Sequence, residues 1–131
     1  MNSNVTFVKT TDLAQADLAS LQSSKFESCA KTSVASAVQA GLAESAPGAT
    51  VESVTFASLP AASFGDATKA FRVTAVVKVQ GQTVKVYADV VLMLKGRAEG
   101  SVEFTNVGAP FDPTLETTLI ATFGNRMVAN A

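Results

Sequence analysis

The chain contains no histidine and only one cysteine, Cys29, among its 131 residues. A single cysteine excludes an internal disulfide. Without histidine the chain lacks the usual base for activating a catalytic thiol. Only carboxylate metal sites would remain, and no acidic calcium loop of the D-x-D-x-D-G kind is present. We therefore expect no metal, and we expect Cys29 to be a small buried side chain on a helix.

Charge is also scarce. Asp, Glu, Lys and Arg make up 16% of the chain and the formal net charge is −1, whereas soluble proteins average about 25% charged residues. Nucleic-acid binding requires a concentrated basic surface, so we expect no nucleic-acid partner. Glycine loops that cradle phosphates, G-x-G-x-x-G and G-K-[ST], are absent. With no catalytic constellation and no cofactor motif, the sequence favours a protein that is not an enzyme.

Long apolar runs are missing as well. No stretch approaches the roughly 18 consecutive apolar residues of a membrane span, and residues 1–4 lack the basic start of a signal peptide. The Ala-, Val-, Thr- and Ser-rich composition is typical of exported bacterial proteins. We expect an extracellular or cell-envelope location with a leader removed, and a cytoplasmic one if Met1 is the native start.

The most informative feature that is present is alternation of apolar and polar residues from Lys69 to Val107. Apolar side chains occupy the odd positions of 71–79 and the even positions of 84–94. This period of two predicts antiparallel strands. Turns are predicted at Gly81-Gln82, of type II′, and over three residues at Lys95-Gly96-Arg97.

These turns set a predicted register. The first turn places Val79 opposite Val84, Phe71 opposite Leu92 and Lys78 opposite Lys85. The second places Leu94 opposite Ala98, Val90 opposite Val102 and Asp89 opposite Glu103. In this register apolar residues of all three strands share one face.

Further elements flank this meander. We expect an edge strand near Val5 to Lys9, and Thr10 to Asp12 as the N-terminal cap of a short helix. A second helix, a strand and a C-terminal helix are predicted over 25–42, over 50–59 and from Asp112-Pro113 onward, with Pro47-Gly48 ending the second helix. With 47% hydrophobic residues, residues 1–131 are expected to form a single α+β domain.

The predicted fold is an antiparallel sheet of four or five strands covered by N-terminal and C-terminal helices. If these helices share one face, the result is a cystatin-like roll. If they lie on opposite faces, it is a sandwich. The polar second face of the meander favours one main covered face.

That second face is also the candidate site. The predicted register gathers charged and polar side chains there, among them Arg72, Tyr87, Asp89 and Glu103, which we take as candidate ligand-binding residues. A shallow ligand or docking surface and an ordinary solvated face are both compatible with the pattern. The neighbouring carboxylates of Asp89 and Glu103 would perturb each other's pKa.

Several short segments carry a family resemblance: Phe71-Arg72-Val73-Thr74, Gln80-Gly81-Gln82-Thr83-Val84, Tyr87-Ala88-Asp89, Lys95-Gly96-Arg97-Ala98 and Val107-Gly108-Ala109-Pro110-Phe111. They resemble small exported or lipid-anchored proteins of actinobacteria, of the LpqN lipoprotein type, with a PsbP-like α/β/α sandwich fold. The resemblance implies a cell-envelope protein of this fold. It implies no catalytic residue.

The sequence thus favours a non-enzymatic extracytoplasmic domain that binds an unknown protein or a hydrophobic ligand, as a monomer or weak dimer. One alternative is an enzyme of cystatin-like type with a pocket between sheet and helix that uses Asp89, Tyr87 or Glu103. Another is a structural module that self-associates through an edge strand.

Overall fold

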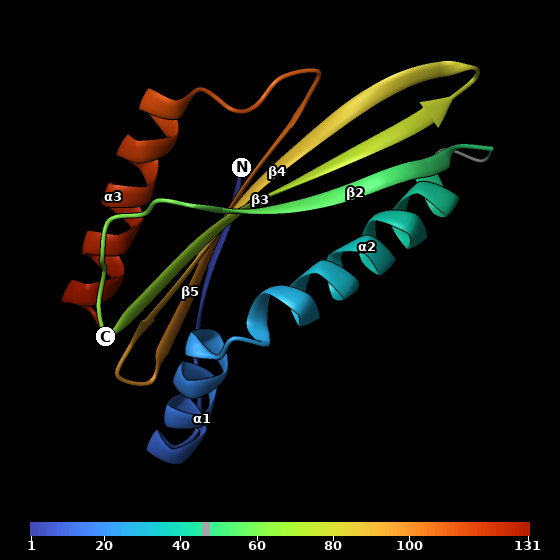
Figure 1. The fold of residues 1–131 in the computed structure, drawn as a ribbon. Coiled ribbons are helices and arrows are strands. Elements are labelled where there is room, and N and C mark those ends of the chain that lie inside the picture. Colours follow the sequence, from blue (N-terminus) through green and yellow to red (C-terminus); the bar gives the residue numbers. More distant parts are fainter. Residues whose placement is uncertain (46–47) are drawn as a thin grey trace.

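The computed structural model describes residues 1–45 and 48–131 and shows one sheet with three helices (Figure 1). In chain order the elements are β1 (Asn2–Phe7), α1 (Thr11–Gln22), α2 (Phe26–Ser45), β2 (Thr50–Leu59), β3 (Ala67–Val79), β4 (Gln82–Lys95), β5 (Ala98–Val107) and α3 (Pro113–Ala129). The predicted α+β class is confirmed. Pro47, the predicted end of the second helix, lies outside the described residues.

The five strands lie in the order β1-β5-β4-β3-β2, and every neighbouring pair is antiparallel. β1 and β2 therefore form the two edges of the sheet. Over the described residues no helix is both long enough and apolar enough to cross a membrane.

The predicted helix caps are present. The Thr10 hydroxyl accepts a hydrogen bond from the Leu13 amide at 3.3 Å, and the Asp112 carboxylate accepts one from the Leu115 amide at 2.8 Å. Each satisfies one of the free amides at a helix N-terminus. Pro113 follows Asp112 as the first residue of α3, where its missing N–H costs nothing.

The β3–β4 turn differs from the prediction by one residue. Its two central residues are Gln80 and Gly81, with φ of 50° and 82°, and Val79 pairs with Gln82. Positive φ at both positions is the geometry of a type I′ turn, whose twist matches that of the strands. The pairing shifts by two residues, which keeps every side chain on its predicted face.

The shift changes which charges face each other. Lys85 now lies opposite Val76 instead of Lys78, and Asp89 lies opposite Arg72 instead of Thr74. The unfavourable lysine pair of the predicted register is gone, and a carboxylate and a guanidinium have become cross-strand neighbours.

The β4–β5 turn is one residue shorter than predicted, and this difference changes which side chains of β5 lie on each face of the sheet. Lys95 pairs with Ala98, so the loop has two residues, Gly96 and Arg97, and not three. Asp66 holds this turn, since its carboxylate accepts from the Gly96 amide at 2.7 Å and the Lys95 ammonium at 3.1 Å. The guanidinium of Arg97 donates to the carbonyls of Val8 and Lys9.

A loop one residue shorter reverses the faces of β5. Asp89 lies opposite Phe104, Val90 opposite Glu103 and Val91 opposite Val102. The prediction that Asp89 and Glu103 are neighbours is therefore wrong. The even residues of β5 lie on the same face as Arg72 and Asp89, and the odd residues lie on the other face.

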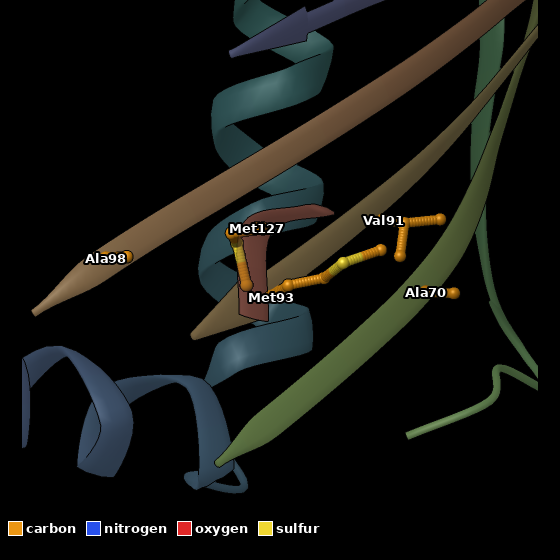
Figure 2. Close-up of a cluster of buried hydrophobic side chains, with 5 residues drawn as sticks. All are labelled: Ala70, Val91, Met93, Ala98 and Met127. Atoms are coloured by element: carbon orange, nitrogen blue, oxygen red, sulfur yellow. The ribbon is translucent and has the colours of Figure 1, made fainter. Parts of the chain in front are cut away.

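Helices cover both faces of the sheet, so the expectation of one main covered face is wrong. In Figure 1 the sheet is seen between α3 on one side and α1 and α2 on the other. On the α1–α2 face, Phe26 packs edge-on against Phe71 with ring centroids 5.9 Å apart. On the α3 face, Met127 joins a buried cluster with Ala70, Val91, Met93 and Ala98 (Figure 2).

The inward line of α2 runs through Phe26, Ala30 and Val34, which are half-buried and spaced by four residues. Cys29 lies off this line and is exposed, so the prediction of a buried thiol is wrong.

Gly100 sets how closely α3 approaches β5. A methyl group built at Gly100 would lie 2.5 Å from the Met127 sulfur and 2.9 Å from the Phe123 ring. The side chains of α3 therefore fill the space that the missing Cβ leaves.

We predict that Gly100→Ala destabilises the domain by about 1–3 kcal/mol, because the added methyl overpacks this contact. Chemical denaturation followed by circular dichroism measures the change. Gly41→Ala is the control, since a methyl there meets nothing within 4 Å and alanine favours a helix. Equal stability of Gly100→Ala and wild type would contradict this packing.

Candidate functional site

Arg72 and Asp89, two of the predicted site residues, form a salt bridge on the α3 face. The guanidinium donates from Nε to one carboxylate oxygen at 2.6 Å and from Nη2 to the other at 2.5 Å. Two parallel bonds of this kind are the strong geometry for an arginine and a carboxylate. Asp89 is 1% exposed, so its charge depends on this partner, and the pair raises the pKa of Arg72.

The other two predicted residues are separated. Tyr87 alternates with Asp89 on β4 and so shares its face, and it interacts electrostatically with Arg72. Glu103 lies on the α1–α2 face, is exposed, and accepts a hydrogen bond from Thr105 at 3.0 Å. The structure therefore assembles three of the four candidates and leaves Glu103 on the opposite side of the sheet.

A fifth residue, Glu116 of α3, joins the cluster. Glu116 is only 8% exposed. Burial, the negative charge of Asp89 and a hydrogen bond to that carboxyl raise its pKa to about 7, while Arg72 acts in the opposite direction. Sequence reasoning missed Glu116 because an acid in the first turn of a helix is ordinarily explained by the helix dipole.

Glu116 also lines a cavity of about 260 Å³ between α3 and the segment after β2. Its other lining is almost entirely apolar and comes from residues 59–62, Phe64, Ala70 and one side of α3. Both oxygens of Asp89 are held by Arg72, so the cluster offers one group that gains or loses a proton near pH 7. This group is the Glu116 carboxyl, which lies between α3 and the sheet. We infer that its main role is structural: it helps to hold α3 on the sheet.

We predict that Glu116 makes the domain less stable as the pH rises. Its pKa is raised on folding, so its contribution is fully present below the ordinary value of 4.5 and is lost as the pH rises through about 7. The upper limit is roughly 3 kcal/mol, because one pKa unit corresponds to about 1.4 kcal/mol.

Urea denaturation between pH 4.5 and 8 tests this contribution. Glu116→Gln should reduce the fall in stability across that range, since a neutral amide cannot ionise, and the remaining fall belongs to Glu99, whose pKa is also raised. Glu52→Gln, at an exposed carboxyl on β2, should retain it. Identical profiles for Glu116→Gln and wild type would show that the carboxyl is not held as described.

The α1–α2 face contains a hollow of about 480 Å³, here called the apolar groove. One wall is formed by Val34, Ala37 and Gly41 of α2 and the floor by β3 and β4, with Glu103 at its border. The floor residues are Val73, Ala75, Val77, Val86, Ala88 and Val90. The α2 residues described on this wall have small side chains or none, so they extend only a short distance toward the sheet.

A second hollow of about 300 Å³, here called the acidic pocket, lies where α1 crosses β1, β5 and the end of β4. Its polar lining is Asn4, Thr6, Asp17, Ser20, Glu99 and Ser101, and its apolar lining includes Leu21, Phe26, Leu92 and Leu94. Burial and a hydrogen bond to the neighbouring Asp17 carboxyl raise the pKa of Glu99.

The described residues contain no group of three or more Cys, Asp or Glu side chains that could hold a metal ion. No profile of a known protein family, no curated protein and no solved structure matches the chain significantly.

Proposed function

We propose that this chain is a non-enzymatic binding domain that takes a small apolar ligand in the apolar groove. One observation carries the proposal: among the described residues, an apolar surface of β3 and β4 lies beside α2 with a hollow of about 480 Å³ between them. Val73, Ala75 and Val77 are buried in the floor, whereas Val86 and Val90 of β4 remain half-buried beside the hollow.

The dimensions of the groove favour a small molecule over a protein segment. Its volume of about 480 Å³ falls within the roughly 300–1,000 Å³ of ligand sites. The floor consists of paired strands, which hold a fixed shape. The lining is apolar apart from Glu103 at the border, so a ligand would gain free energy mainly through removal of apolar surface from water.

The enzyme alternative receives less support from the geometry. It requires a pocket between sheet and helix in which Asp89, Tyr87 or Glu103 acts on a substrate. Asp89 is buried beneath α3 with both oxygens engaged by Arg72, and Glu103 lies on the opposite face. A binding role uses the groove without requiring any of these groups to react.

We also propose an extracytoplasmic location, as the LpqN-type resemblance implies. The support is the low charge of 16% and the Ala-, Val-, Thr- and Ser-rich composition. Fractionation of the native cells, with N-terminal sequencing of the protein recovered, tests the location. Recovery of the chain solely from cytosol, with Met1 intact, would contradict it.

Ligand binding is tested with a neutral apolar fluorophore, N-phenyl-1-naphthylamine, whose emission rises in an apolar site. We predict saturable binding, because the groove supplies a site of fixed volume. Ala37→Phe should weaken it about tenfold or more, since the new ring fills the hollow that Ala37 lines.

Gln39→Phe is the matched control, because Gln39 is exposed on the same helix and is not among the lining residues of the groove. It adds the same ring outside the hollow and should leave binding unchanged. Equal weakening by both variants, or no saturable binding by wild type, would overturn the proposed function.

A further inference from the structure

The two edges of the sheet are protected to different degrees. An unpaired edge can add a strand from a second molecule, and natural edge strands ordinarily prevent this with a charge, a proline, a bulge or a covering element. In β2, Glu52 lies at a bulge in the pairing with β3. The helix α2 runs alongside β2, and Glu27 of α2 accepts a hydrogen bond from Ser58 (Figure 1). β1 has the sequence Asn-Ser-Asn-Val-Thr-Phe, without charge or proline, and it pairs with β5 in one unbroken register.

The outer side of β1 presents backbone groups in the pattern of an antiparallel ladder. The Val8 amide donates to the Arg97 carbonyl at 2.9 Å, so the backbone at this position points toward β5. The direction of these groups alternates along an antiparallel strand. The amides and carbonyls of Ser3, Val5 and Phe7 therefore point away from β5, to the outside of the sheet. All six residues of β1 are exposed, so a further strand can reach these groups.

The side chains of β1 also leave apolar surface in water. Val5 and Phe7 lie on the α3 face of the sheet and are 42% and 58% exposed. Asn2, Asn4 and Thr6 lie on the other face and are polar but uncharged. A strand added beside β1 would remove part of the exposed apolar surface from water. The edge therefore fits an uncharged strand whose apolar side chains lie on the α3 face.

We propose that β1 is a dimerisation edge, which pairs antiparallel with β1 of a second copy of this chain and joins two five-stranded sheets into one. Val5 lies opposite the partner's Val5 on a two-fold axis. Ser3 then lies opposite the partner's Phe7, and Asn4 lies opposite the partner's Thr6. This alignment pairs the full set of outward backbone groups, and each pair that involves Ser3, Val5 or Phe7 forms two backbone hydrogen bonds.

A second copy fits this edge because β1 is complementary to itself. The two-fold axis places Val5 and Phe7 of both copies on one face of the joined sheet and the uncharged polar side chains on the other, so β1 brings no like charges together. The contact is small, since a strand of six residues provides less than the roughly 800 Å² per partner of a standard interface. We therefore expect a weak dimer with a dissociation constant of about 10–300 µM.

Sedimentation equilibrium of the full chain, from about 10 µM to about 1 mM, tests the dimer. We expect a reversible monomer–dimer equilibrium. Val5→Lys should raise the dissociation constant about tenfold or more, because two lysines would face each other at the axis. Thr55→Lys adds the same charge at an exposed position of the other edge strand and should leave the constant unchanged. Equal weakening by the two variants, or a wild type that stays monomeric at every concentration, would overturn the proposal.

Disulfide cross-linking tests the alignment in the folded chain. Val5→Cys is made together with Cys29→Ser, because Cys29 is an exposed thiol. Residues paired as Val5 is have Cα atoms about 5.5 Å apart, within the range of a disulfide. Mild oxidation should therefore yield a covalent dimer. Phe7→Cys in the same background is the control, since the two copies of Phe7 would lie roughly 13 Å apart along the strands. No covalent dimer of Val5→Cys, or equal yields from both variants, would overturn the alignment.

Dimerisation and ligand binding are separable. The apolar groove lies over β3 and β4 beside α2, and Val5 is not among its lining residues. Val5→Lys should therefore bind N-phenyl-1-naphthylamine as wild type does, and circular dichroism melts establish that the variant is folded. A folded monomeric Val5→Lys that loses the fluorophore would contradict this separation, whereas a wild type that dimerises without binding the fluorophore would support the edge and overturn the proposed function.

Discussion

The two-residue turn at Gly96 and Arg97 is the constraint on which the rest of the structure depends. Its length determines which residues of β5, the odd or the even ones, face α3. A one-residue change in a loop moves every side chain of a strand to the opposite face. With this turn, Val102 and Phe104 face α3, and Glu99 and Glu103 face the other way. Asp66 holds the turn through the Gly96 amide and the Lys95 ammonium, and these two contacts lower its pKa.

The orientation of the β5 side chains explains why one face of the sheet is densely packed and the other contains hollows. The α3 face receives apolar side chains from β4 and β5 together, and Gly100 lets Met127 and Phe123 come close, so it is filled. Arg72, Asp89 and Glu116 lie within that packed layer, and their mutual neutralisation allows charge to be buried there. The α1–α2 face receives Glu99, Ser101 and Glu103 from β5. Among the described residues, this face keeps a hollow between its valines and the small side chains of α2.

The sequence was sufficient for most elements, although β1 begins three residues earlier than predicted, but it was not sufficient for the pairing between strands. Alternation from Phe71 to Val79 predicts the strand, Asp112-Pro113 predicts the start of α3, and 50–59 matches β2. Loop length was the weak step, because Gly81 and Gly96 are each compatible with turns of different length and placement. The predicted three-residue loop places all apolar residues on one face, which suits a sheet covered on one side only, whereas this sheet is covered on both. Glu116 could not be predicted as a site residue for a related reason. The sequence around it does not show that the first turn of α3 lies against the buried Asp89.

The contrast between the faces also indicates where binding can occur without loss of the fold. Opening the α3 face would expose Met93, Val91 and Phe104, which are at most 1% exposed, and would separate Asp89 from Arg72. Occupying the α1–α2 face requires no such rearrangement, because its hollows are present beside a completed sheet. A pre-formed site binds without the cost of ordering the protein. The fold therefore packs one face for stability, and the hollows lie on the other face, where we propose that the ligand binds.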